Sequence, residues 1–160
     1  MMIVSLKGSD SLHAFHDPRT DKVELLSSRQ PAGGQALPIG SDLVLYSDPE
    51  GTLCQIEVSL NDVAMAESLP ERPSHCRTAL DVEAEVSVSA RPTVKFEPSS
   101  GVLQLVFEGI EAKTWGRLGD NLIWLALDDD FRLAALVVEG VSRDPGGAGV
   151  ATWLSKFVED

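Results

Sequence analysis

Histidine and cysteine side chains are the first place to look for metal chemistry in this chain of 160 residues. The histidines are His13, His16 and His75, and His75 is followed directly by Cys76. A zinc site needs three or four nitrogen or sulfur ligands that converge on one point. On a strand, residues three apart point to opposite faces, so His13 and His16 cannot hold one ion without a bulge. We therefore expect no metal site.

The run Asp128, Asp129 and Asp130 offers the carboxylate oxygens that hard cations prefer. It lacks the spaced ligands and the closing glutamate of a calcium loop. The stretch Asp48-Pro49-Glu50-Gly51, 80 residues earlier, is also acidic and is rich in turn-forming residues. Two solvated hairpin turns explain both stretches at once, and a cation site is the less favoured interpretation.

The sequence has no catalytic signature. Many serines are present, but none stands in a Gly-x-Ser-x-Gly elbow, and neither Cys54 nor Cys76 has a nucleophile motif around it. The segment Gly146-Gly147-Ala148-Gly149 resembles a phosphate cradle but has no following lysine, so it indicates a flexible entry to a helix. We expect no catalytic residues and no cofactor.

One aromatic residue stands between cations. Trp115 lies in Lys113-Thr114-Trp115-Gly116-Arg117, which we interpret as a loop. Tryptophan and arginine are enriched among residues that anchor interfaces. Trp115 and Arg117, together with Asp128, Asp129 and Asp130, are the candidate partner- or ligand-binding residues. The alternative is that Trp115 plugs one end of a barrel.

The elements around these residues are predicted to be strands, because apolar residues alternate at period two between Pro, Gly, Asp and Asn. Residues 61–67 are predicted to be a short helix that begins at Asn61, and residues 69–76, with two prolines, a linker. The predicted strands are Ile3 to Lys7, Leu12 to His16, Lys22 to Leu26, Asp42 to Ser47, Leu53 to Ser59, Glu83 to Ser89, Thr93 to Glu97, Val102 to Phe107, Asn121 to Leu127 and Leu133 to Glu139.

The two halves of the chain match at an offset of 80 residues in alternation and turn placement. A one-residue shift places Gly40 to Leu45 on Gly119 to Trp124. The fold class predicted is mainly β: two tandem antiparallel β-meander units, residues 1–75 and 76–160, around a pseudo-two-fold axis. They share one core as a sandwich or a closed barrel, with a short C-terminal α-helix.

The halves differ on their outward positions. Gln55 and Glu57 correspond to Ala135 and Val137, so the later strands are apolar on both faces and need cover on both. Residues 150–158 have helical apolar spacing and are predicted to supply it by packing on their own sheet. The alternative is that this helix docks on another subunit and forms a homodimer.

Each half resembles a bacterial family of small β-meander domains of unknown function. The resemblance rests on the openings His16-Asp17-Pro18 and Phe96-Glu97-Pro98, and on the acidic turns followed by strands that end at Glu57 and Glu139. The first opening lacks the aromatic residue, and the turns lack a shared Asp-x-Gly-Arg pattern. The resemblance implies a β-meander fold in tandem copies and no activity.

Composition narrows the class of partner. The formal net charge of −12 and the isoelectric point near 4.5 disfavour nucleic acid and anionic membranes. The N-terminal segment has no signal-peptide pattern, no apolar run approaches the length of a spanning helix, and two cysteines do not describe a disulfide scaffold. We expect a cytoplasmic protein.

These observations predict a non-catalytic acidic protein-interaction module, and in particular an immunity or antitoxin-type inhibitor that masks a basic partner protein. The alternative is a small-molecule-binding β-barrel or an enzyme of secondary metabolism. In that case Trp115, Trp124 and Tyr46 would line the pocket.

Overall fold

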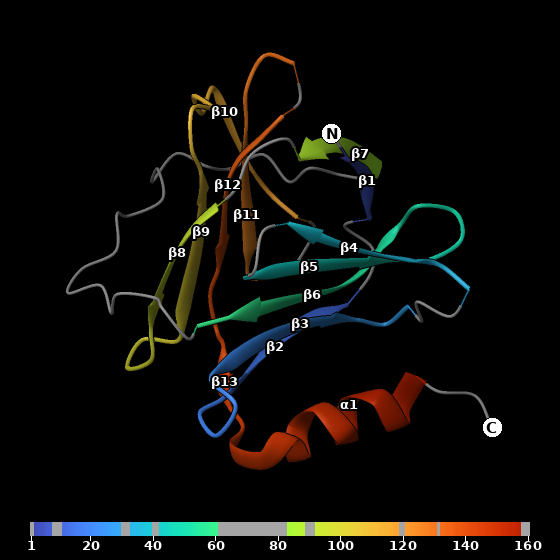
Figure 1. Cartoon of the computed structure of the whole chain (residues 1–160), viewed down its shortest axis with the longest axis vertical. Helices are drawn as coiled ribbons and strands as arrows, with labels where there is room; N and C mark the ends of the chain where they lie inside the picture. The colour runs from blue at the N-terminus through green and yellow to red at the C-terminus, as the bar shows by residue number, and fades with distance from the viewer. Residues whose placement is uncertain are drawn as a thin grey trace.

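The chain folds into two packed β-sheets, a two-stranded ribbon and one C-terminal helix, as a computed structural model shows (Figure 1). The structure describes residues 2–7, 11–29, 33–39, 42–60, 83–88, 92–118, 121–130 and 132–157. Both the predicted helix at 61–67 and the linker at 69–76 lie outside these residues. So do His75 and Cys76.

The first sheet has six strands in the order β13-β2-β3-β6-β5-β4. All neighbours are antiparallel except β13 and β2, which are parallel. The bounds are Leu12–Asp17 (β2), Lys22–Ser27 (β3), Gln35–Ile39 (β4), Leu43–Ser47 (β5), Leu53–Ser59 (β6) and Ser142–Arg143 (β13).

The second sheet has five antiparallel strands in the order β10-β11-β12-β9-β8. Its strands run crosswise to those of the first sheet in Figure 1. The bounds are Pro92–Glu97 (β8), Val102–Phe107 (β9), Thr114–Arg117 (β10), Ile123–Leu127 (β11) and Leu133–Val138 (β12).

Strand pairing repeats at an offset of 80 residues, which confirms the internal duplication. Leu43 pairs with Val58 in the first sheet, and Ile123 pairs with Val138 in the second. Both hairpins carry an irregularity at the same place, after Tyr46 and after Ala126. Asp21 has a φ of 57° and Gly101, its equivalent, has a φ of 67°, so even the left-handed turn position is repeated.

A third sheet joins the two halves symmetrically. β1 (Met2–Lys7) and β7 (Glu83–Val88) form an antiparallel pair in which Ser5 lies opposite Glu85, the residue 80 positions later. A pair centred on equivalent residues is what a two-fold relation between the halves produces. The predicted pseudo-two-fold axis therefore passes through this ribbon.

The inner faces of the two sheets form one hydrophobic cluster. Each inward position is apolar in both halves: Val23 and Leu103, Leu25 and Leu105, Leu43 and Ile123, Leu45 and Leu125, Ile56 and Leu136, Val58 and Val138. Among the described residues no strand of one half's meander pairs with a strand of the other half's meander. The fold is thus the sandwich of the two predicted alternatives and not the closed barrel.

The C-terminal helix α1 (Ala148–Phe157) is confirmed, but its predicted position is wrong. It lies along the six-stranded sheet of the first half in Figure 1, where the Trp153 Nε1–H donates to the Ser27 carbonyl at 3.1 Å. β13 pairs with β2 just before the helix and so carries the chain across to the other sheet. At the crossing, a Cβ on Gly149 would stand 2.9 Å from the Phe15 ring, so only glycine permits this approach.

Three strands were not predicted, and one segment was wrongly interpreted as a loop. β4 and β10 each pair with one neighbour only, and they contain Pro38 and Gly116, which weaken the strand pattern. Trp115 and Arg117 therefore lie on an edge strand. The predicted one-residue shift holds for β4 against β10, where Ala36 and Trp115 are equivalent, but not for β5 against β11.

Candidate functional site

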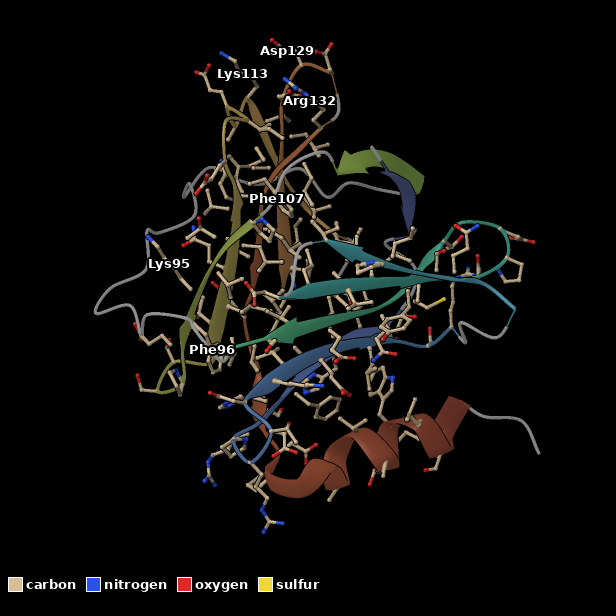
Figure 2. The ribbon with its side chains drawn as sticks, in the orientation of Figure 1. Lys95, Phe96, Phe107, Lys113, Asp129 and Arg132 are labelled. Carbon is tan, nitrogen blue, oxygen red and sulfur yellow. The ribbon has the colours of Figure 1, made fainter. Side chains whose placement is uncertain are left out.

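The acidic run at 128–130 forms the turn between β11 and β12 (Figure 2). The Asp128 Oδ1 accepts the backbone N–H groups of Asp130 and Arg132, both at 2.9 Å, and its Oδ2 accepts the Arg132 Nε–H at 2.7 Å. Burial alone raises the pKa of Asp128, but these donors and the nearby guanidinium outweigh it and hold the pKa below its ordinary value.

The equivalent turn in the first half has the same geometry. The Asp48 Oδ1 accepts the N–H groups of Glu50 and Thr52 at 3.0 and 2.9 Å. Repetition of the same bonds, with no ligand needed to explain them, accounts for both acidic turns as hairpin chemistry. Among the described residues no group of three or more His, Cys, Asp or Glu side chains is placed to hold a metal ion.

The other two candidate residues lie on β10, beside that turn. Trp115 packs against the small buried residues Ala126, Ala134 and Ala135 on the outer face of the five-stranded sheet. The Arg117 guanidinium lies 5.5 Å from the ring centroid of Trp124, and its Nε–H donates to the Asn121 carbonyl at 2.8 Å. The five candidates thus share one edge of the sheet.

A different cluster of charged groups stands out on the outer face of the six-stranded sheet. Glu24 on β3 lies directly opposite Glu57 on β6. Their neighbours Val23, Leu25, Ile56 and Val58 are buried in the core, so both carboxylates point to the other face. The Lys22 Nζ donates to the Glu57 Oε1 at 2.9 Å, and the Tyr46 hydroxyl donates to the Glu57 Oε2 at 3.3 Å. We call Lys22, Glu24, Tyr46 and Glu57 the acidic face.

The electrostatics of this acidic face are uneven. Hydrogen bonding to Glu57 raises the pKa of Lys22, which is the mark of a satisfied ion pair. Burial, and then the neighbouring carboxylate of Glu57, raise the pKa of Glu24 above its ordinary value of 4.5. Like charges directly opposite each other on a sheet are destabilising. The ionised form of Glu24 is therefore disfavoured where it stands.

An aromatic cluster borders the acidic face on the side of α1. His13, Phe15 and Trp153 form a set in which His13 stacks on Trp153 at 6.1 Å and meets Phe15 edge-on at 4.7 Å. Phe15 also lies directly opposite Glu24 on β3. Both oxygens of the buried Asp144 cap the helix, accepting the N–H groups of Gly149 at 2.7 Å and Val150 at 3.1 Å.

His13 and His16 point to opposite faces of β2, as predicted. His16 packs against Phe96 in the core at 4.7 Å, and its Nε2 makes no hydrogen bond although Asp21 Oδ1 lies 3.7 Å away. The predicted homodimer through α1 stays a prediction, with Trp153 occupied inside its own chain. Cys54 is buried, as is its equivalent Ala134.

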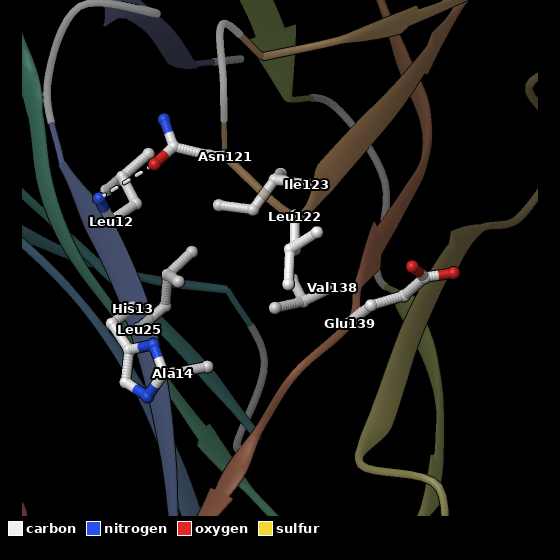
Figure 3. A pocket seen from close by; sticks show the side chains of 9 residues that line it. All are labelled: Leu12, His13, Ala14, Leu25, Asn121, Leu122, Ile123, Val138 and Glu139. Carbon is white, nitrogen blue, oxygen red and sulfur yellow. Dashed lines mark hydrogen bonds between the residues drawn. The ribbon is translucent and has the colours of Figure 1, made fainter.

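A cavity of about 150 Å³ lies where the two halves meet, at the edge of β2 above β13 (Figure 3). Neither Tyr46, Trp115 nor Trp124 lines it, so the predicted set of pocket residues is wrong: these three side chains lie on outer faces of the sheets. Its lining is Leu12, His13, Ala14, Leu25, Asn121, Leu122, Ile123, Val138 and Glu139.

Fold and site together define a class, a duplicated two-sheet β protein with one charged and one apolar outer face. No protein-family model matches the chain, and no curated protein matches it. The resemblance to the family of β-meander domains stays a prediction. In the described part of the chain no helix is long and apolar enough to cross a bilayer, since α1 has 10 residues.

Sequence reasoning missed the acidic face as a unit. Glu57 was recognised as outward-pointing, but Glu24 is 33 positions away and meets it only through the register of β3 and β6. A signal was present in the duplication: Glu24, Glu57 and Tyr46 correspond to Gln104, Val137 and Ala126, so the three polar positions are replaced together.

Proposed function

We propose that this chain is a non-catalytic protein-interaction module that binds a basic protein in the cytoplasm through its acidic face, in the manner of immunity or antitoxin-type inhibitors. One observation carries the proposal, the opposed carboxylates of Glu24 and Glu57. Their ionised forms repel each other in a half-buried place, and the raised pKa of Glu24 reports that repulsion. A lysine or arginine of a partner placed between them would relieve it.

The surroundings of this carboxylate pair favour a cation with an apolar stem. Phe15 stands opposite Glu24, and the Tyr46 ring stands beside Glu57. Lysine and arginine side chains combine a charged head with an aliphatic stem, and arginine also packs well on aromatic rings. The negative net charge of the whole chain adds long-range attraction that speeds encounter with a basic protein.

The test is capture of a partner from native lysate on the tagged, full-length protein at low and at high salt. We expect one basic protein in stoichiometric amount at low salt and its loss at high salt. With that protein purified, the association rate should fall steeply as salt rises. An association rate that does not change with salt, or no basic partner in the lysate, contradicts the proposal.

Two charge-matched variants locate the surface. Glu24→Gln with Glu57→Gln removes two negative charges from the acidic face, and Asp129→Asn with Asp130→Asn removes two from the exposed turn. We expect the first pair to weaken binding about tenfold or more, which is about 1.4 kcal/mol, and the second to change it much less. The reverse result would move the interface to the sequence-predicted candidates at the turn.

A further inference from the structure

The cavity between the halves has the composition of a small-ligand site. Leu25 from the first half and Ile123 and Val138 from the second form aliphatic walls. Polar side chains lie at opposite ends in Figure 3, with Asn121 at one end and His13 at the other. Ligand pockets are mostly apolar with a few placed polar groups that orient the ligand.

Volume limits what fits. The cavity measures about 150 Å³. A cavity of about 150 Å³ lined by Leu, Ile and Phe side chains in another protein binds benzene. One six-membered ring therefore fills the space, and larger cofactors are excluded. Leu122, at the rim, is 48% exposed, so the cavity reaches the molecular surface and has an entry path.

The two polar ends are held in place by the fold. The Asn121 Oδ1 accepts the Leu12 backbone N–H at 3.0 Å, which fixes the plane of the amide. The His13 Nε2 and the Ser142 hydroxyl are 2.8 Å apart, and the His13 ring stacks on Trp153. Fixed polar groups reward a ligand that carries a matching hydrogen-bonding group and penalise one that does not.

Charge points to a neutral ligand. Burial lowers the pKa of His13, so its imidazole is neutral at pH 7 and offers no charge to an anion. The carboxylate of Glu139 lines the rim, and the whole chain is strongly negative, which further disfavours anions. The aliphatic walls give a buried charge nothing to pair with.

We propose that this cavity binds a small neutral molecule made of one ring that carries one hydroxyl group. The site is separate from the acidic face and does not depend on the proposed binding of a basic protein. Phenol is the simplest probe of this class, and benzene, which has the ring without the hydroxyl, is its matched control.

The experiment is a titration of the full-length, ¹³C-methyl-labelled protein with phenol and with benzene, followed by NMR. We expect saturable shifts confined to the methyl groups of Leu12, Leu25, Ile123 and Val138, with phenol binding about 5- to 10-fold more tightly than benzene. Shifts that do not saturate, or that centre on other methyl groups, overturn the proposal.

Two variants assign the contributions of volume and polarity. Ala14→Val adds two methyl groups at the cavity wall and should abolish phenol binding, whereas Ala36→Val makes the same change at an exposed position of β4 and should leave it intact. If Ala14→Val does not fold, His13→Phe still tests the site. It keeps the ring beside Trp153 but removes the nitrogen, so phenol and benzene should bind equally. An unchanged preference for phenol would overturn the assigned role of His13.

Discussion

The outer faces of the two sheets differ although the strands beneath them pair in the same register. In the first half the outward positions hold Glu24 and Glu57, and in the second their equivalents are Gln104 and Val137. Gln104 and Val137 are buried, whereas Glu57 keeps 24% of its side chain exposed. The inward positions are apolar in both halves.

The difference teaches which positions define this fold. Register is fixed by the apolar face of each strand, because a slip of one residue would turn that face outward. The outward positions are under no such constraint, so one half could acquire charges and the other an apolar surface without a change of topology. Function is therefore to be sought where the halves disagree.

The largest effect is expected from giving the second half the residue of the first. Val137→Glu places a carboxylate where only 4% of the residue is exposed, and a buried charge with no partner costs about 3–5 kcal/mol. The reciprocal change, Glu57→Val, removes a half-exposed ion pair and should alter the free energy of unfolding by less than about 1 kcal/mol.

Urea unfolding followed by tryptophan fluorescence measures both changes. Val137→Thr is the control, because it keeps the shape of valine and adds polarity without charge. It should cost about 1–3 kcal/mol, between the two glutamate and valine exchanges. Equal costs for Val137→Glu and Glu57→Val would mean that the outer faces are equivalent after all.

The next effect concerns the helix that covers only one side of the first sheet. Trp153→Ala removes the ring that packs on His13 and Phe15 and the bond to the Ser27 carbonyl. Full burial of such a ring is worth about 3–5 kcal/mol, so this half-buried one should cost about 2 kcal/mol.

The matched control for the helix is Leu154→Ala, one residue further along α1. Leu154 is 39% exposed, and its loss should cost less than about 0.5 kcal/mol. Thermal unfolding of both variants decides the point. If the two midpoints fall equally, α1 is not anchored by Trp153, and the six-stranded sheet would have an outer face as open along β2 as along β5.

A smaller effect is expected at the hairpin turns, where the halves agree. Asp48→Ala removes the acceptor of two backbone N–H groups and should cost about 1–2 kcal/mol. Asp128→Ala should be at least as costly, because Asp128 also binds the Arg132 guanidinium.

The lowered pKa of Asp128 sets the direction of the pH dependence at its turn. Its stabilisation is complete above the unfolded value of 3.8 and is lost as pH falls through the lower pKa of the folded state. Unfolding of wild type and of Asp128→Ala between pH 2 and 6 should therefore converge at the acid end. A constant difference across that range would contradict the assigned role of the carboxylate.

Most of the fold could be predicted because the inner faces repeat a strong period-two pattern. The ten predicted strands all form, with ends within one or two residues of the prediction. β4, β10 and β13 were missed because edge strands need fewer apolar residues, and Pro38 and Gly116 interrupt two of them.

The candidate sites could be predicted much less well. The pairing of Glu24 with Glu57 depends on strand register, and the crossing of α1 to the other half depends on a parallel bridge of two residues at β13. The cavity is a space left between side chains from four strands. No local pattern of residue types encodes any of these three features.

The smallest predicted effect bears most directly on the proposed function. Glu24→Gln should stabilise the protein at pH 7 by a few tenths to about 1 kcal/mol, because it ends the repulsion from Glu57 across the two strands. A carboxyl group whose pKa is raised on folding favours the folded state when it is protonated. The destabilisation by Glu24 therefore appears as pH rises above 4.5 and is absent below it. The corresponding change in the second half, Gln104→Glu, has the opposite sign, since Gln104 is only 6% exposed and its carbonyl oxygen has no hydrogen-bond partner. Urea unfolding of both variants at pH 4 and pH 7 measures the two signs. A Glu24→Gln protein less stable than wild type at pH 7 would show that the carboxylate is already compensated within the chain, and the acidic face would then have no stored repulsion for a basic partner to relieve.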